Sequence, residues 1–99
     1  MPTVLEKTYR LYNRKYFGNK LPKVPDVDLR WADIPEMGYE LGGEIVLNKR
    51  YRTRDAVWKL VLLHEMNHLY TPVEKDDHGP KFQRGMLRLA KAGAFKDLW

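Results

Sequence analysis

Cysteine is absent from the 99-residue chain. This excludes disulfides, cysteine-ligated zinc ribbons and thiol nucleophiles, and it fits a reducing compartment. Long apolar runs are also missing, because the longest strongly apolar run, residues 60–63, is far too short to span a bilayer. Met1 is followed by Pro2 and a charged helical pattern, so no signal peptide is predicted. We therefore expect one domain over residues 1–99 of a soluble, cytoplasmic protein that is monomeric and has no membrane partner.

Acidic residues are in the minority. The chain has 18 Lys and Arg against 13 Asp and Glu, which gives a formal net charge of +5. This balance favours acidic partners, DNA among them. The densest basic stretch comprises Lys49, Arg50, Tyr51, Arg52 and Arg54. Two interpretations stay open: a phosphate-contacting loop in which Tyr51 stacks on a base, or a solvated connection between a strand and a helix.

Three segments carry a helical pattern. In the first, residues 4–17, apolar residues recur at three- and four-residue steps. The second is expected to begin near Asp55, as its N-cap, and to end before Pro72. It is apolar on nearly all sides, which is typical of a buried, central helix. The third is predicted from Pro80 to about Gly93.

Three short strands are predicted between the first and second helices. Apolar residues alternate there with other residues, the pattern of half-buried strands: Val27, Leu29 and Trp31; Met37, Tyr39 and Leu41; Ile45 and Leu47. Between the last two runs lies Gly42-Gly43, a pair that a two-residue hairpin turn with positive φ angles prefers. The predicted fold class is therefore α+β, with a small, mainly antiparallel, three-stranded sheet between an N-terminal helix and two later helices.

The second predicted helix carries His64, Glu65 and His68 in the pattern H-E-x-x-H. Residues four apart on a helix lie one turn above one another, so both imidazoles can share one zinc ion. Glu65 is rotated by about 100° from His64 and can stand beside the metal without ligating it. The pattern predicts two zinc ligands and a catalytic carboxylate that takes a proton from the attacking water.

A catalytic zinc site needs a third protein ligand. The one remaining histidine of the chain, His78, follows His68 by ten residues and is the best candidate. Glu74, Asp76 and Asp77 are the alternatives. The tyrosines considered for stabilising the oxyanion are Tyr39, Tyr51 and Tyr70, which the sequence does not rank.

The chain resembles the SprT-like family, whose metallopeptidase domain also occurs in Spartan-type proteases. The matching segments are residues 11–13, 16–18, 21–22, 43–48, 64–68 and 78–82, the last reading His-Gly-Pro-Lys-Phe. The resemblance implies a zincin-like minimal fold, one catalytic zinc held by His64, His68 and His78, and cleavage of protein substrates. In some members these substrates are crosslinked to DNA. No zinc ribbon is expected within these 99 cysteine-free residues.

The leading hypothesis is a zinc-dependent endopeptidase of the H-E-x-x-H type, acting on proteins that include DNA-bound ones. Two alternatives are a non-catalytic DNA- or protein-binding module with a structural zinc, and a latent peptidase whose cleft is covered by Trp99 or by the first helix. If the family's fold applies, an extended substrate would pair with an edge strand beside the cleft. The strand around Ile45 to Asn48 is one candidate for that edge.

Overall fold

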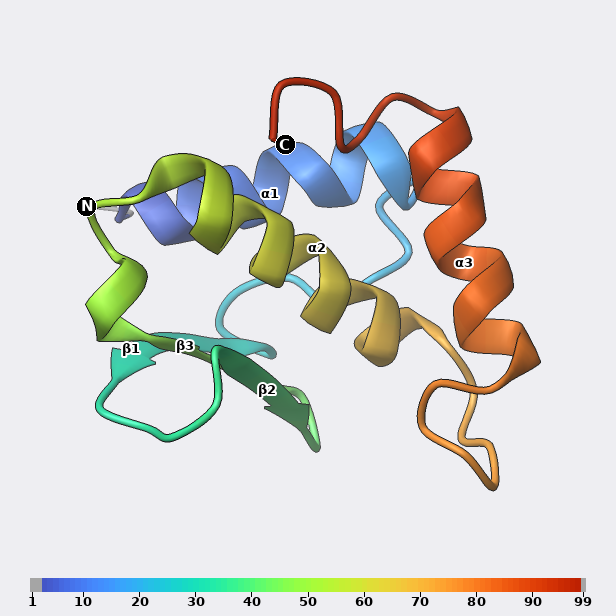
Figure 1. Cartoon of the computed structure of the whole chain (residues 1–99), viewed down its shortest axis with the longest axis horizontal. Helices are drawn as coiled ribbons and strands as arrows, with labels where there is room; N and C mark the ends of the chain where they lie inside the picture. The colour runs from blue at the N-terminus through green and yellow to red at the C-terminus, as the bar shows by residue number, and fades with distance from the viewer. Residues whose placement is uncertain (1–2, 99) are drawn as a thin grey trace.

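The computed structural model describes residues 3–98 and confirms the α+β fold class (Figure 1). The elements follow the predicted order, and the hairpin turn has the predicted positive φ angles, 58° at Gly42 and 85° at Gly43. Pro80 occupies the start of the last helix, as expected. The elements are α1 (Val4–Tyr16), β1 (Asp28–Ala32), β2 (Gly38–Leu41), β3 (Glu44–Asn48), the short 3-10 turn η1 (Lys49–Tyr51), α2 (Asp55–Tyr70) and α3 (Pro80–Lys91).

The sheet is mixed, which corrects the prediction of a mainly antiparallel one. Its strand order is β1-β3-β2, with β3 antiparallel to β2 and parallel to β1. The loop after β1 carries the chain past the position of β3, so the hairpin inserts its second strand between β1 and β2. The continuous apolar run Ile45–Leu47 is fully buried, as is typical of a central strand.

In β2 the apolar side chains lie on the outer face of the sheet and not on the face that packs against the helices. A Cβ on Gly38 would lie only 2.7 Å from Cγ1 of Val61 in α2, so Gly38 faces the helix. By alternation Glu40 does so too, whereas Tyr39 and Leu41 share the outer face. Leu41 is accordingly 73% exposed. The helix-facing side of this edge strand borders a cleft instead of the core, and it therefore carries a glycine and a carboxylate.

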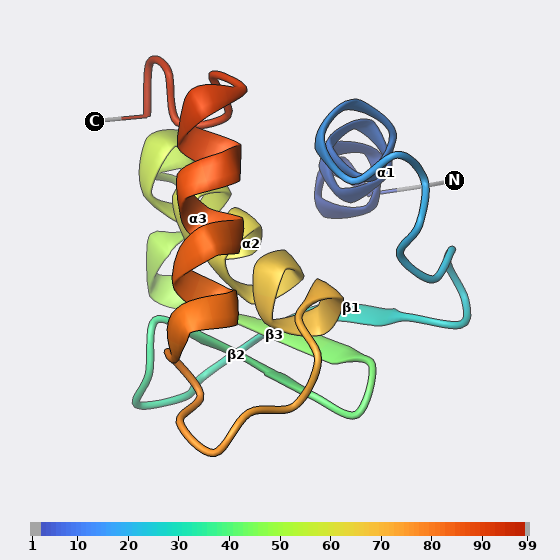
Figure 2. The ribbon, with the colours of Figure 1, turned by 90° about the vertical axis from the view of Figure 1, so that its right-hand side faces the viewer.

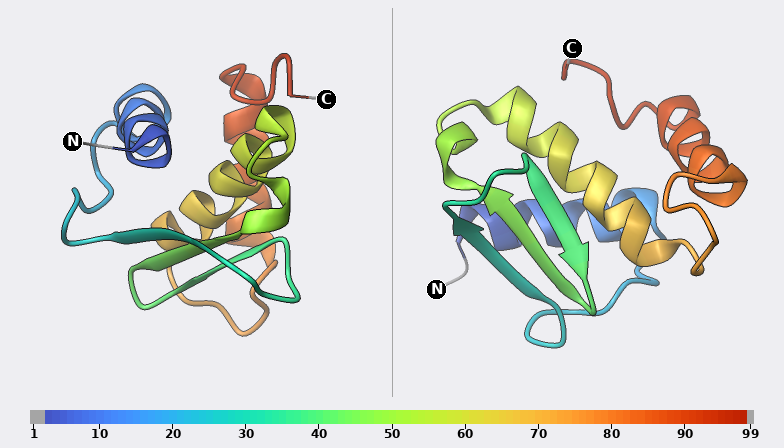
Figure 3. Two further views of the ribbon diagram at one scale, coloured as in Figure 1. Left: turned by 90° about the vertical axis from the view of Figure 1, so that its left-hand side faces the viewer. Right: turned by 60° about the horizontal axis from the view of Figure 1, so that its bottom comes forward.

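The core lies between the sheet and three helices on one side of it (Figures 2 and 3). α2 lies over β2 and β3, with α1 and α3 on its two flanks (Figure 2). Leu62, Leu63 and Met66 of α2 are fully buried, as the all-round apolar pattern predicted. After α3, Ala94 and Phe95 return to the core. Within residues 3–98 the structure has no helix long and apolar enough to cross a membrane.

The start of α2 differs from the prediction in one respect. Asp55 is the first residue of the helix and not its N-cap; the N-cap position is Arg54, which makes no side-chain capping bond. The Asp55 carboxylate instead accepts a 3.0 Å hydrogen bond from the indole Nε1 of Trp58. Trp58 is buried and meets Trp31 of β1 edge-on, with ring centroids 5.6 Å apart. Both tryptophans therefore hold α2 against the sheet.

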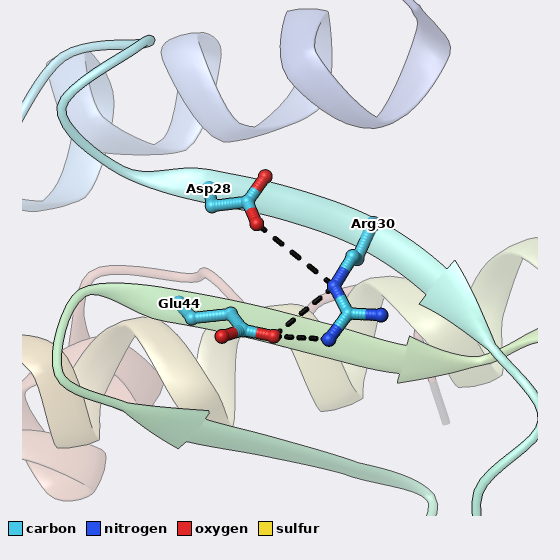
Figure 4. A network of polar contacts seen from close by, with 3 residues as sticks. All are labelled: Asp28, Arg30 and Glu44. Carbon is cyan, nitrogen blue, oxygen red and sulfur yellow. Dashed lines mark hydrogen bonds and ion pairs between the residues drawn. The ribbon is translucent and has the colours of Figure 1, made fainter.

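The outer face of the sheet is polar where β1 meets β3 (Figure 4). The guanidinium of Arg30 donates to Glu44 on the neighbouring strand, and its Nε lies 3.9 Å from the Asp28 carboxylate. The bond from Arg30 and the charge of Glu44 both raise the pKa of Arg30. This exposed network ties the edge strand β1 to β3, on the face that the helices leave uncovered.

Candidate metal centre and cleft

Three imidazoles converge beside the C-terminal half of α2. His64 and His68 lie one turn apart on that helix, and His78 comes from the loop just before α3. The Nε2 atom of His78 is 3.4 Å from that of His64 and 3.2 Å from that of His68. The ligand atoms of the three residues all lie within 4.8 Å of one another, so the cluster could hold a metal ion.

The protonation states of His64 and His68 suit a metal ion. Burial, followed by the neighbouring His68 and His78, lowers the pKa of His64 to about 4. Burial also lowers the pKa of His68, again with His78 as a neighbour. Both imidazoles are therefore neutral near pH 7, the form that ligates metals. Three nitrogen donors that open onto a cleft match the ligand count of a catalytic metal site.

Phe82 of α3 supports all three imidazoles. Its ring stacks on His68 with a centroid separation of 4.2 Å, and it meets His64 and His78 edge-on at 5.0 and 4.9 Å. The carbonyl of Phe82 accepts a 3.0 Å hydrogen bond from Nδ2 of Asn67, which is fully buried in α2. The aromatic residue of the His-Gly-x-x-Phe segment therefore positions the rings and itself depends on α2.

The loop before α3 holds His78 in place. The backbone amide of His78 donates a 3.0 Å hydrogen bond to Oδ1 of Asp76, and the carbonyl of His78 accepts a 2.8 Å bond from Nε2 of Gln83. Glu74 has a different function from the one considered for it: its carboxylate accepts bonds from the amides of Lys81 and Phe82, at 3.0 and 3.2 Å. It therefore caps α3. Of the four candidates for the third ligand, the structure brings His78 to the histidine pair.

Glu65 is buried beside these imidazoles, with 6% of its surface exposed. Burial, and to a lesser degree the charge of Glu40, raises the pKa of Glu65 to about 7. A carboxyl group with such a pKa can both accept and return a proton near neutral pH. A perturbed carboxyl group next to a histidine cluster that could hold a metal ion is a physical sign of a functional site.

A cleft of about 830 Å³ runs along the histidine cluster. β2 and the hairpin turn form one side, and α2 with the loop after it forms the other. Four carboxylates border the cleft, and none of the described residues that line it is Lys or Arg. The lining residues are Glu36, Gly38, Tyr39, Glu40, Leu41, Gly42, Gly43, His64, Glu65, His68, Leu69, Thr71, Val73, Asp77 and His78.

The edge strand beside this cleft is β2. The sequence-based candidate around Ile45 to Asn48 was wrong, because β3 pairs on both sides and offers no free edge. Within residues 3–98, β2 pairs with β3 alone, so its other edge can accept a further strand.

The tyrosines considered for the oxyanion are not directed into the cleft. Tyr39 borders it as part of β2, but alternation directs its side chain to the outer face, near Arg30 across the sheet. Tyr51 packs against the core, and Tyr70 contacts Phe17 and the guanidinium of Arg88. The coverings considered for a latent form lack structural support too: no α1 residue lines the cleft, and Trp99 lies outside the described residues.

The basic stretch lies at the other end of α2 from the histidines, around η1 (Figure 1). Lys49, Arg50, Arg52 and Arg54 are all exposed. The guanidinium of Arg52 lies 5.9 Å from the centre of the Trp31 ring. Because Tyr51 is half-buried against the core, its ring is not freely available for stacking on a base. The four exposed cations remain candidates for contacts with phosphate.

Two residues that position the site escaped sequence analysis. Glu40 looked like the polar member of an alternating strand, and only the orientation of β2 brings its charge close enough to influence Glu65 and His68. Asn67 occupies a variable position of the H-E-x-x-H pattern, so the pattern gives it no function. An asparagine in a helix predicted to be buried was nevertheless a usable signal, because a buried polar side chain requires hydrogen-bond partners, and Asn67 is indeed fully buried.

A helix that presents two histidines one turn apart over a small mixed sheet defines a metallopeptidase-like domain. Residues 5–97 match the family model of SprT-like proteins, and the chain belongs to the SprT-like family. The resemblance seen in the sequence is thereby confirmed. Neither the curated proteins nor the solved structures include a match to the chain.

Proposed function

We propose that this protein is a zinc-dependent endopeptidase that hydrolyses peptide bonds in proteins. The observation that carries the proposal is the position of Glu65, a buried carboxyl group that shares the cleft with three convergent imidazoles. His64, His68 and His78 would hold the ion, and an all-nitrogen set of three ligands suits zinc. A bound zinc ion supplies Lewis acidity, which lowers the pKa of water to about 7 and polarises a carbonyl group.

The residues of the chain supply the proton transfers. The Glu65 carboxylate accepts a proton from the water whose oxygen bonds to the scissile carbonyl carbon. It then returns that proton to the amide nitrogen as the C–N bond breaks, so the two products are a carboxylic acid and an amine. A carboxyl group with a pKa of about 7 suits both steps near neutral pH.

The substrate would bind as an extended strand along β2. Its backbone can pair with the free edge of β2, as in other cases of strand addition. Glu36, Glu40 and Asp77 give the cleft an acidic border on a chain whose net charge is +5. This border favours basic peptide segments, which DNA-bound proteins expose. DNA-bound or DNA-crosslinked proteins in the cytoplasm are therefore the substrates that we propose.

Two basic surfaces support the DNA part of the proposal. One is the exposed set Lys49, Arg50, Arg52 and Arg54 around η1. The other is a stripe on α3 that sequence analysis overlooked, formed by Lys81, Arg84, Arg88 and Lys91. These four residues recur at helical spacing, and α3 contains no acidic residue. The α3 stripe borders a groove that also includes Tyr70, an aromatic ring that is 39% exposed.

The testing experiment is cleavage of a small basic DNA-binding protein by the zinc-loaded chain, with and without single-stranded DNA. Glu65→Gln is the matched blank, because it keeps the three imidazoles and removes the base. We expect cleavage by the wild type and none by Glu65→Gln, with one zinc bound to each. Zinc binding without cleavage would favour a binding module with a structural metal. Cleavage that appears only after trimming of the chain would favour a latent peptidase.

The DNA part of the proposal is tested separately by charge reversal. Glu substitutions at Lys49 and Arg50 are compared with Glu substitutions at Lys81 and Arg84, with binding to single-stranded DNA as the readout. Each phosphate contact that is lost should lower the salt dependence of binding. Binding unchanged in both variants, or absent in the wild type, would remove DNA from the proposal and leave a general peptidase.

A further inference from the structure

A second cavity lies directly behind the catalytic carboxyl group. It has a volume of about 350 Å³, and its walls are the side chains of Met37, Leu60, Val61 and Met86. His64 and Glu65 close it on the side of the metal centre. The cavity therefore combines residues from the segment before β2, from α2 and from α3, and its remaining walls are apolar.

This cavity is continuous with the proposed reaction site. His64, Glu65 and Gly38 line both the cleft and the cavity. A peptide that follows the edge of β2 and presents a carbonyl group at the histidines therefore passes the mouth of the cavity within about one residue of the bond to be cleaved. Side chains of an extended strand point alternately to its two sides, so one neighbour of the scissile bond faces this mouth.

The size and chemistry of the cavity define its occupant. An apolar cavity of about 150 Å³ already accommodates benzene, so 350 Å³ is ample for a Phe, Leu or Met side chain. The two methionines, flexible and polarisable, allow the walls to adapt to different apolar shapes. Glu65 would repel an acidic side chain, and the walls of Met37, Leu60, Val61 and Met86 offer a polar side chain no hydrogen-bond partner.

We propose that this cavity is the specificity subsite of the enzyme, and that it receives a large apolar side chain from the substrate residue next to the scissile bond. The inference rests on the proposed peptidase function and adds the substrate class to it. Together with the acidic border of the cleft, it describes a preferred substrate as a basic segment interrupted by a large apolar residue. Met86, on α3, sets the depth of the subsite, since it forms the wall that α2 and β2 do not supply.

Binding can be tested without any cleavage. Zinc-loaded Glu65→Gln is labelled with ¹³C at the methionine methyl groups and titrated with two basic peptides that differ only in Phe or Ala at one position. We expect the Phe peptide to shift the Met37 and Met86 signals, and the Ala peptide to leave them in place. Met66, fully buried in the core, is the internal control and should not move in either titration. Absence of any shift at Met37 and Met86 with a bound Phe peptide would overturn the proposal.

Selectivity is then measured with the wild-type enzyme on a peptide series that varies each position around the cleaved bond. We expect kcat/KM to favour Phe, Leu and Met over Ala by roughly 10- to 100-fold at one neighbouring position. Met86→Phe should narrow the subsite and reduce the Phe-to-Ala ratio at least tenfold, whereas Met86→Ala should extend tolerance to Trp. Leu87→Phe is the matched control, because Leu87 is the adjacent residue of α3 and is 54% exposed.

The outcomes separate this inference from the function on which it rests. Cleavage of the whole series at equal rates would overturn the subsite and leave the peptidase intact. No cleavage of any peptide would count against the peptidase, while Phe-dependent shifts at Met37 and Met86 in Glu65→Gln would still support an apolar binding site. If the Phe-to-Ala ratio of kcat/KM changed equally in Met86→Phe and Leu87→Phe, the assignment of the cavity as the specificity subsite would also be overturned, because Leu87 does not line the cavity.

Discussion

The side-chain amide of Asn67 donates a 3.0 Å hydrogen bond to the backbone carbonyl of Phe82 and thereby joins the two helices that flank the histidine cluster. Asn67 stands between the two histidines of α2, and Phe82 stacks on one of them. The helices come this close because α3 has Gly85 at the crossing. A Cβ there would lie 2.2 Å from Oδ1 of Asn67, well inside any permitted contact.

We predict that Gly85→Ala destabilises the protein in spite of the helix propensity of alanine. In an exposed helix interior the change would stabilise by up to about 1 kcal/mol. Here the new methyl group overlaps a buried side chain that is itself hydrogen-bonded, and overpacking of this kind costs about 1–3 kcal/mol. Urea unfolding of the metal-free protein measures the net effect.

Ala90→Gly is the control for this prediction, because Ala90 lies on the exposed side of the same helix and reports propensity alone. It should cost about 1 kcal/mol or less. A gain in stability for Gly85→Ala would contradict the close crossing of α2 and α3. We also expect Gly85→Ala to weaken zinc binding, since it displaces Asn67 and with it the support of Phe82.

The sequence predicted the helices and the convergence of the three histidines better than the sheet, and the reasons are physical. The pattern His64-x-x-x-His68 needs only the local geometry of one helix, and His78 was the one histidine left to complete the site. The parallel pairing of β1 with β3 depends on the path of the loop between β1 and β2, which no local pattern encodes.

The orientation of β2 shows why a regular pattern can mislead. Its alternation is genuine, but alternation alone does not say which set of side chains meets the core. Leu41 is exposed and Glu40 faces α2 because a cleft occupies the helix side of this edge. For the same reason neither the influence of Glu40 on Glu65 nor the apolar cavity could be predicted before the layers were assembled.

A second prediction separates the ligand from the residue that caps α3. His78→Ala should abolish the stabilisation that zinc confers, which for a site that binds only the folded state is about 2.7 kcal/mol when free zinc is at 100 times Kd. Glu74→Ala should lower stability by about 1 kcal/mol through loss of the cap, yet retain one zinc per chain. Thermal unfolding with and without zinc, together with metal analysis, provides the measurement. Zinc retained in His78→Ala and lost in Glu74→Ala would reverse the assignment.

A third prediction concerns the charge that Glu40 places near Glu65. In the metal-free protein Glu40→Gln should lower the pKa of Glu65, because the Glu40 carboxylate opposes ionisation of Glu65. Burial is the larger cause and persists in the variant, so the pKa should stay above the ordinary value of 4.5. A ¹³C titration of the glutamate side-chain carboxyl groups measures it, with the Glu65→Gln spectrum assigning the signal. An unchanged pKa in Glu40→Gln would show that the two groups are farther apart than the structure places them.

The last prediction turns the buried carboxyl group into a dependence of stability on pH. In the folded, metal-free chain the pKa of Glu65 is about 7, against 4.5 as the ordinary value in the unfolded chain. The folded state therefore binds the extra proton between pH 4.5 and 7, and stability is lost as the pH rises through that window. Glu65→Gln has no such group. The free energy of unfolding of Glu65→Gln minus that of the wild type should therefore increase from pH 4.5 to 7, by at most about 1.4 kcal/mol per pH unit. Above pH 7 this difference should stay constant.

Comparison of these two proteins also removes the opposing effect of His64. Its pKa is about 4 in the folded chain against an ordinary value of 6.5, so this group destabilises the fold as the pH falls below 6.5. The wild type and Glu65→Gln share this contribution of His64, so it cancels in the difference between their free energies of unfolding. Urea unfolding at several pH values in the presence of a chelator measures that difference. A difference that is flat between pH 4.5 and 7 would mean that Glu65 ionises as freely as a solvent-exposed glutamate. It would then lack the buried setting on which its assignment as the proton acceptor depends.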